Sequence, residues 1–372
     1  MKSISKLLFL SLILLTTCID PINIVTEGNE GVLVVDGLIT DQPGPYTVRL
    51  SNTSNYVTLN GNQIRQVIGA QVKITDNEGT IEVLEETSSG TYQTKDSGIQ
   101  GIIGNTYTLD ITLPDGSQFQ SEPQLLNAVD DIDSIYFEFE QRTKFDAEGN
   151  EVPDDGFNIM ADVSNVTDDD FYLWKWSGVY EILTSPKDRT KPGPNFNSPP
   201  RVPDPPNCSG YILAGGIVTK VCDDCCTCCN CWVELTNNQF HVATKTAYSN
   251  NKLKRVPIAF VPVDNRIFYN KLYAVFDQYS LSKRTFEFWN TAKNQLESNG
   301  SIFEPSPSKI PSNILSLTED QDVLGIFGAS AIKTQAIFIS KTDIPYPVQS
   351  DTMNIDCRDF GAKSISKRPI FW

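Results

Sequence analysis

The amino-acid sequence predicts a mainly β protein, and two observations lead to this fold class. Val, Ile, Thr, Tyr and Phe dominate the 372 residues, and turn-forming residues recur at short intervals. Several apolar runs also alternate strictly with polar residues, which is the period of a strand with one buried face. We predict an N-terminal β-sandwich of immunoglobulin or transthyretin type, followed by a second β-rich domain that carries one amphipathic helix.

One-faced strands predict the first domain, residues 31–124. Residues 46–50 (YTVRL) and 70–74 (AQVKI) alternate apolar and polar side chains. Residues 107–113 form another such strand, and Pro114-Asp115-Gly116 supplies the turn that closes it. Roughly six or seven short antiparallel strands in such a segment suit a sandwich of two sheets.

The second domain is predicted to span residues 125–372. Its strand candidates are residues 133–140, 171–182, 272–280, 323–332 and 335–339. A Pro- and Cys-rich segment, residues 185–231, interrupts them and includes Pro199-Pro200 and Pro205-Pro206. Because proline supplies no backbone donor, a sheet interior does not tolerate so many prolines. We therefore predict a loop on the surface.

One helix has clear start and stop signals. Ser282 is a suitable N-cap, and Leu281 and Phe286 have the spacing of a hydrophobic staple. The apolar face that follows contains Phe286, Trp289 and Leu296. Asn299-Gly300 supplies a left-handed stop. We expect this aromatic face to pack against the sheet; the alternative is a shelf for a ligand.

The N-terminus has the pattern of a secretory signal. Two lysines precede an apolar run over residues 7–15, which is well short of the ~20 residues of a membrane-spanning helix. Cys18, with Leu15 three residues before it, resembles the lipobox of bacterial lipoprotein precursors. That resemblance implies a signal peptide over residues 1–17, lipidation of Cys18, and a tether over residues 18–30. Two or three acyl chains would make the attachment durable.

Charge and composition exclude several classes of function. The formal charge of −16 becomes −18 once the two lysines of the signal are removed, which argues against nucleic acid or an anionic membrane surface as the ligand. His241 is the only histidine, and neither a Gly-x-Ser-x-Gly nor a His-Glu-x-x-His motif is present. We expect no enzyme and no cofactor, although paired carboxylates of a glycosidase depend on the fold and stay open.

Three smaller features have both a structural and a functional interpretation. His241 lies in a strand-like stretch, and we interpret it as structural. Asp168-Asp169-Asp170 is either a calcium site or, as we favour, a solvated turn. Trp174 and Trp176 share one face of a strand, and we expect them to pack between sheets and not to stack on a sugar.

Eight further cysteines form the most unusual local pattern: Cys208, Cys222, Cys225, Cys226, Cys228, Cys229, Cys231 and Cys357. Cys222-x-x-Cys225 and Cys228-x-x-Cys231 have the spacing of zinc ligands. An even count in an exported chain favours disulfides that pin the long loop to the second domain, and partly free thiols are a third possibility. Eight cysteines allow on the order of a hundred connectivities, and the sequence does not choose among them.

Nearly the whole chain after the signal resembles the DUF4249 family of Bacteroidota lipoproteins, through the order and spacing of short motifs. These are Cys18-Ile-Asp-Pro21, Leu33-Val-Val-Asp-Gly-Leu-Ile-Thr40, Gly44-Pro45-Tyr46, Gly69-Ala-Gln-Val-Lys-Ile74, Ile132-Asp-Ser-Ile135, Cys231-Trp232, Gln278-Tyr-Ser-Leu281, Phe288-Trp289, Gly300-Ser-Ile-Phe303, Pro311-Ser-Asn-Ile314, Val323-Leu-Gly-Ile-Phe-Gly-Ala-Ser330 and Lys367-Arg-Pro-Ile-Phe-Trp372.

The resemblance implies a lipid-anchored protein of the outer membrane, facing the periplasm or the cell surface. It also implies a partner, a SusC-like TonB-dependent barrel, for which the protein would be an accessory subunit in nutrient capture or uptake. A stand-alone glycan- or peptide-binding module or adhesin is the alternative, and a glycoside hydrolase is the less favoured one. No catalytic or binding residues carry over from the resemblance. We predict the contact surface on the second domain, because its Pro- and Cys-rich loops are its largest irregular segments and long loops frequently carry function.

Overall fold

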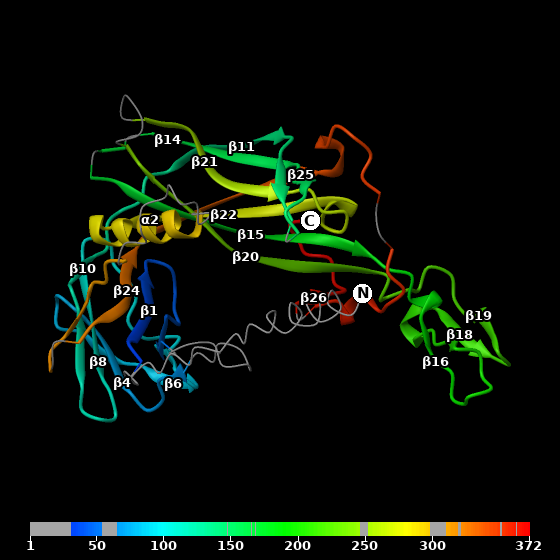
Figure 1. The fold of residues 1–372 in the computed structure, drawn as a ribbon, viewed down its shortest axis with the longest axis horizontal. Helices are drawn as coiled ribbons and strands as arrows, with labels where there is room; N and C mark the ends of the chain where they lie inside the picture. The colour runs from blue at the N-terminus through cyan, green and yellow to red at the C-terminus, as the bar shows by residue number, and fades with distance from the viewer. Residues whose placement is uncertain are drawn as a thin grey trace, which may run out of the picture.

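The computed structural model describes residues 31–372 except 54–64, 147, 165, 168, 246–251, 298–309, 319–320, 350–351 and 362. Over this part the chain is mainly β, as predicted, and forms two packed β-sandwiches from which a third, slender element projects (Figure 1). The predicted signal, the lipidation site Cys18 and the helix stop at Asn299-Gly300 lie outside the described residues.

The first sandwich contains two six-stranded sheets. In one sheet the order is β24-β1-β2-β7-β6, with β3 also paired to β2. The bounds are β1 (Leu33–Thr40), β2 (Thr47–Asn52), β3 (Arg65–Gln66), β6 (Glu85–Ser88), β7 (Thr91–Gln93) and β24 (Val323–Ser330). In the other the order is β23-β9-β8-β4-β5, with β10 paired to β8. Its strands are β4 (Gln71–Asp76), β5 (Ile81–Val83), β8 (Thr106–Thr112), β9 (Gln118–Ser121), β10 (Gln124–Leu125) and β23 (Ile314–Ser316).

The strict alternation in the sequence corresponds to the inward faces of these strands. Val72 and Ile74 of β4 are buried, as are Tyr107, Leu109 and Ile111 of β8. They belong to one hydrophobic cluster with Val48 and Leu50 of β2 in the opposite sheet. Burial of apolar area between the sheets therefore holds the sandwich together.

Two strands of this sandwich come from far along the chain. β24 pairs in parallel with β1, from Leu33 opposite Val323 to Thr40 opposite Ser330. β23 pairs with β9. The division at residue 124 assigned both strands to the second domain, whereas they belong to the sheets of the first. Gly325 has a φ of +91°, and a Cβ there would overlap the carbonyl oxygen of Val35, so this close parallel pairing needs a glycine.

The second domain is also a sandwich, built from a three-stranded and a five-stranded sheet. The smaller sheet contains β11 (Ile132–Glu140), β14 (Gly156–Ser164) and β21 (Lys252–Pro262). The larger has the order β25-β22-β15-β20-β26, with β15 (Phe171–Leu183), β20 (Asn230–Thr244), β22 (Lys271–Leu281), β25 (Ile332–Ser340) and β26 (Ser364–Ile365). β12 (Thr143–Phe145) and β13 (Glu151–Pro153) form a separate hairpin.

Large aromatic side chains fill the core of the second domain. Trp174 is 0% exposed and Trp176 is 4% exposed, and they belong to one apolar cluster with Phe157, Phe268 and Phe276. The interpretation of the two tryptophans as core residues is confirmed. Neither of them is accessible for stacking on a sugar.

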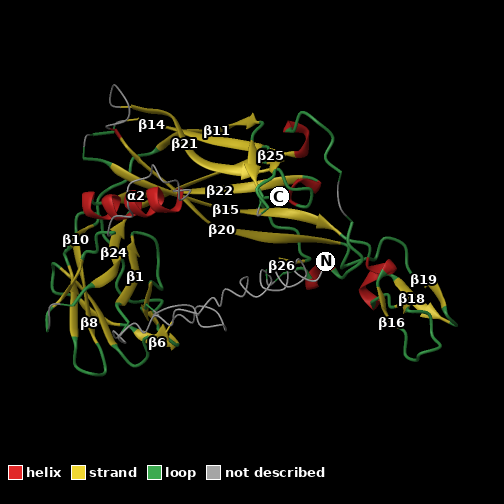
Figure 2. Ribbon diagram, viewed as in Figure 1, coloured by secondary structure: helices red, strands yellow, loops and turns green. Residues whose placement is uncertain are grey.

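Helix α2 (Lys283–Glu297) lies against the larger sheet (Figure 2). The N-cap is confirmed, because the Oγ of Ser282 accepts a hydrogen bond from the backbone N–H of Thr285 at 3.2 Å. Two ring pairs join the helix to the sheet, Phe286 with Phe171 and Trp289 with Phe240, each with ring centroids 4.9 Å apart. The prediction was wrong for Leu296, which is 75% exposed.

Candidate functional site

The predicted surface loop is an ordered projection that leaves the end of the second domain (Figure 1). We call residues 185–229 the projection; it connects β15 to β20. It contains two hairpins, one of β16 (Thr190–Pro192) and β17 (Arg201–Pro203), and one of β18 (Tyr211–Ala214) and β19 (Ile217–Lys220). Each pair is a two-stranded sheet, so every strand is an edge strand, where proline is tolerated.

The projection has almost no interior. None of residues 187–208 is buried, and of residues 209–227 only Ser209 and Gly210 are. A segment with so little buried apolar area cannot offset its conformational entropy by packing alone. Other constraints must therefore order it.

Disulfides supply these constraints. All eight predicted cysteines are paired: Cys208–Cys228, Cys222–Cys225, Cys226–Cys229 and Cys231–Cys357. Cys228 and Cys231, which have the spacing of zinc ligands, belong to different disulfides, so the structure does not support that zinc site. The thiolates that a zinc ion requires are not free in this state.

One further cluster has the composition of a metal site. Cys208, Cys228 and Asp356 place their sulfur and oxygen atoms within 4.8 Å of one another, the single such group found in the described part of the chain. The two sulfurs are bonded to each other, and Asp356 accepts hydrogen bonds from Arg358, the shortest at 2.6 Å. That guanidinium lowers the pKa of the Asp356 carboxyl. The cluster is therefore a structural junction.

The four disulfides fall into two classes. Cys208–Cys228 and Cys231–Cys357 join residues 20 and 126 positions apart, and Cys228, Cys231 and Cys357 are completely buried. The backbone N–H of Cys357 also donates to the carbonyl of Cys228 at 3.1 Å. This class ties the projection and the C-terminal segment to the second domain. The second class, Cys222–Cys225 and Cys226–Cys229, spans only three positions each, and its cysteines are half-buried.

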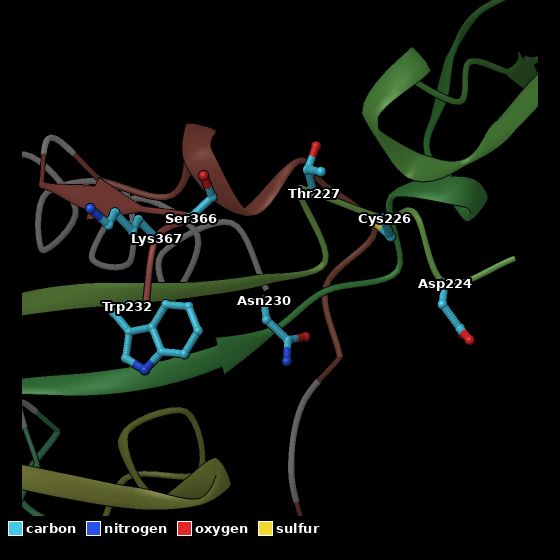
Figure 3. A pocket seen from close by; sticks show the side chains of 7 residues that line it. All are labelled: Asp224, Cys226, Thr227, Asn230, Trp232, Ser366 and Lys367. Carbon is cyan, nitrogen blue, oxygen red and sulfur yellow. The ribbon is translucent and has the colours of Figure 1, made fainter. Parts of the chain in front are cut away.

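Two cavities flank the short disulfides. The larger, of about 610 Å³, is lined by Asp224, Cys226, Thr227, Asn230, Trp232, Ser366 and Lys367. Figure 3 shows Trp232 and Lys367 at one end of this cavity and Cys226 and Asp224 at the other. The smaller, of about 240 Å³, lies at the base of the projection, and all four cysteines of the short disulfides line it. Asp224 and Cys226 line both cavities.

The outer surface of the projection is apolar at several points and nearly neutral in charge. Its exposed large apolar side chains are Phe196, Ile212, Leu213, Ile217 and Val221. Its sequence contains five lysines and arginines and four aspartates, which gives a net charge of +1. The rest of the chain after residue 17 therefore carries −19. The projection therefore does not share the net negative charge of the chain as a whole.

The other predicted site residues lie apart from the projection and have structural roles. His241 is mostly buried on β20, and desolvation, followed by the nearby charge of Lys293, lowers its pKa to about 4. It is therefore neutral at pH 7. In the aspartate triplet, the side chain of Asp170 accepts a hydrogen bond from the backbone N–H of Thr167, and this bond closes a turn. Asp168 lies outside the described residues.

The buried carboxylates of the described residues are engaged in structural bonds. They are Glu181 and Asp356. The two oxygens of Glu181 accept from the side-chain amides of Asn230 and Asn270, at 3.2 and 2.8 Å. Asp356 is held by Arg358. Glu181 therefore fixes the start of β20, at the root of the projection.

Comparison with known proteins gives one match. The family model of the domain of unknown function DUF4249 matches residues 19–336. The chain belongs to the DUF4249 family. The matched range includes the first sandwich, the projection and most of the second domain. No curated protein matches the chain. In the described residues of this DUF4249 protein, no helix has the length and apolarity to cross a membrane.

Sequence reasoning located the cysteines but missed the form of the projection. A signal for the second hairpin was present, because two apolar runs flank Gly215-Gly216. Both glycines adopt positive φ, +59° and +84°, as a two-residue hairpin turn requires. The cavity residues Trp232 and Lys367 had no such signal, since they are 135 positions apart and meet only through the pairing of β20 with β26.

Proposed function

We propose that this protein is a lipid-anchored accessory subunit of an outer-membrane transport complex, and that the projection is the element that contacts a TonB-dependent barrel. One observation carries the proposal: the projection exposes apolar side chains and is also held by disulfides. Stable protein interfaces use apolar side chains presented on a preorganised scaffold.

Rigidity is the first argument for docking. Ordering a flexible segment on binding costs free energy, and constraints that exist before binding reduce this cost. Two disulfides hold the projection in place before any partner binds: Cys208–Cys228, and Cys231–Cys357 beside its base. Phe196, Ile212 and Ile217 are therefore presented at little entropic cost.

Charge is the second argument. The chain after the signal carries −18, and a surface of that charge repels other acidic proteins. The projection does not add to this repulsion, because its own net charge is +1. It can consequently approach an acidic partner without local electrostatic repulsion.

The lipobox at Cys18 provides the third argument. A lipid anchor would confine the protein and a membrane partner to one surface, which raises their effective concentration. Under that condition, the small apolar area of two hairpins suffices for a persistent contact. The Cys18→Ser variant would lose both membrane partition and barrel association if the anchor acts in this way.

Affinity purification from gently solubilised outer membranes tests the proposal. We expect a TonB-dependent barrel to co-purify with the wild-type protein, and its yield to fall at least about tenfold for the Phe196→Asp, Ile217→Asp double variant. The matched control is Phe145→Asp with Ile81→Asp, because these side chains are also exposed, at 75% and 61%, but lie outside the projection. Absence of any barrel from the wild-type sample, or equal loss in both variants, would contradict the proposal.

A stand-alone binding module is the second candidate, and the cavity of about 610 Å³ favours it. Trp232 and Asn230 with Lys367 combine an aromatic ring with polar groups, as small-ligand sites do. Glycan and peptide arrays probed with wild-type protein and with Lys367→Ala would separate the two candidates. Specific binding that this variant loses, together with no barrel in the purification, would favour the module.

A further inference from the structure

We propose that the Cys222–Cys225 disulfide is a thiol–disulfide exchange centre, which accepts an electron pair from the dithiol of a partner protein. This inference does not depend on the transport role, because it concerns the base of the projection and not its apolar surface. Five observations support it: the accessibility of this bond, its spacing, its charged surroundings, the strained turn that it closes and its neighbouring disulfide.

Accessibility and spacing distinguish this bond from the structural ones. Both of its cysteines are half-buried and line the cavity of about 240 Å³, whereas Cys231 and Cys357 are 0% exposed. Its two cysteines are three positions apart, the Cys-x-x-Cys spacing that redox-active disulfides use. An attacking thiolate has to reach a sulfur atom, so the bond in the cavity is open to exchange while the buried bond is protected.

The cavity also contains cationic side chains. Lys187 and Lys220 line it together with Cys222 and Cys225, and Asp224 is the one acidic residue of its lining. Lys220 forms an ion pair with Asp223, which lies inside the Cys-x-x-Cys loop and offsets part of its charge. Positive charge stabilises the thiolate that attacks a disulfide and the thiolate that leaves it.

The loop that the bond closes is strained at one residue. Asp224 adopts a φ of +54°, in the left-handed region that residues other than glycine enter at a cost. The bond between Cys222 and Cys225 holds this turn, and its reduction would free the backbone of Asp224. Asp224 also lines the larger cavity, so reduction would change the wall of both cavities.

A second disulfide lies in position to take part. Cys226–Cys229 lines the same small cavity, and Cys226 is the next residue after Cys225. A thiolate released at Cys225 can pass the electron pair to this bond by internal exchange. Cys208–Cys228 and Cys231–Cys357 stay oxidised in this scheme, so the projection remains attached to the domain.

The exchange is balanced with a protein dithiol as the reductant. One thiolate of the partner attacks a sulfur of the Cys222–Cys225 bond, which breaks the bond, forms a mixed disulfide and releases the other cysteine as a thiolate. The second thiol of the partner then resolves the mixed disulfide. The partner becomes a disulfide, and Cys222 and Cys225 gain two electrons and two protons.

Graded reduction of the folded full-length protein is the first test. The oxidised protein is treated with increasing dithiothreitol without denaturant, alkylated, and mapped by mass spectrometry, while circular dichroism reports the fold. We expect Cys222 and Cys225 to be alkylated at about tenfold lower reductant than Cys231 and Cys357, with an unchanged spectrum. Simultaneous reduction of all bonds, or reduction only on unfolding, would overturn the proposal.

A trapping experiment is the second test. The probe is a reduced thioredoxin-type protein whose resolving cysteine is replaced by serine, so that the mixed disulfide accumulates. We expect the adduct on Cys222 or Cys225. The Cys222→Ala, Cys225→Ala variant should lose it, and the Cys226→Ala, Cys229→Ala variant should keep it. An adduct that survives the first replacement would overturn the assignment.

The role of charge has its own matched pair of variants. Lys187→Gln with Lys220→Gln should slow the exchange several-fold, because the cavity loses its cations. Lys191→Gln removes a lysine that is also on the projection but pairs with Asp204, at 2.9 Å, away from the cavity. That control should exchange at the wild-type rate. Equal rates for the two variants would contradict the proposed electrostatic assistance.

Discussion

The two sandwich domains and the projection are ordered by different physical means. The domains bury aromatic and aliphatic side chains between sheets, and Trp174, Phe276 and Phe327 are completely inaccessible to solvent. The projection buries no apolar side chain between residues 187 and 227, and its order depends on covalent cross-links. The domains use their apolar residues for stability, whereas the projection leaves its apolar residues available for contact.

The difference shows how an element without a core can be ordered. A segment that is stabilised by disulfides needs no apolar residues inside, so replacement of Phe196 or Ile217 at its surface should leave the fold intact. Replacements in a packed core change stability at once, because interiors are close-packed.

Truncation of a core residue gives the largest expected difference between the two regions. Trp174→Ala should lower the free energy of unfolding by about 3–5 kcal/mol, because it removes a large side chain that is 0% exposed. Phe196→Ala, at a completely exposed position, should change it by less than about 0.5 kcal/mol. Urea titration measures both. A large effect at Phe196 would mean that the projection has a core after all.

Removal of a long-range disulfide should have a smaller and more local effect. Replacement of Cys208 and Cys228 together by alanine opens a loop of 20 positions, which is worth about 3 kcal/mol in the chain-entropy model. Because the sandwiches do not depend on this bond, we expect faster proteolysis within residues 187–221 and an unchanged melting temperature of the domains. Cooperative loss of the whole fold would show that the projection and the second domain form one unit.

The smallest of these predicted effects is a pH dependence of the stability of the second domain, which contains His241. The pKa of His241 falls from 6.5 in the unfolded chain to about 4 in the folded one, owing to desolvation. As the pH falls from 7 to 5, the unfolded chain takes up this proton and the folded chain does not. Stability contributed by the neutral imidazole is therefore lost, by about 2 kcal/mol over that range.

Comparison of wild type with His241→Gln isolates this contribution, since His241 is the only histidine. Urea titrations at pH 7 and pH 5 should show a steeper loss of stability in the wild type than in the variant. Identical losses would place the imidazole in contact with water in the folded state.

Local patterns predicted much of the fold. The alternation in residues 70–74 and 107–113 identified the buried faces of β4 and β8, because the direction of a side chain in a strand depends only on its parity. The N-cap at Ser282 was equally local, since it depends on one side chain and the backbone three residues on. Leu296 shows the limit, because it is 75% exposed although it lies on the predicted apolar face, and a helical stripe does not reveal which of its residues other elements cover.

By itself, the sequence determined the β class and the family, and it contains the lipobox-like pattern that ends at Cys18 and the eight further cysteines. These properties reside in composition, short motifs and spacing. Only the tertiary structure decided that β24 lies beside β1, that Cys231 pairs with Cys357, and that residues 185–229 project as hairpins. Each of these depends on which distant segments meet, and that is set by the packing of whole sheets, not by any local preference of the chain.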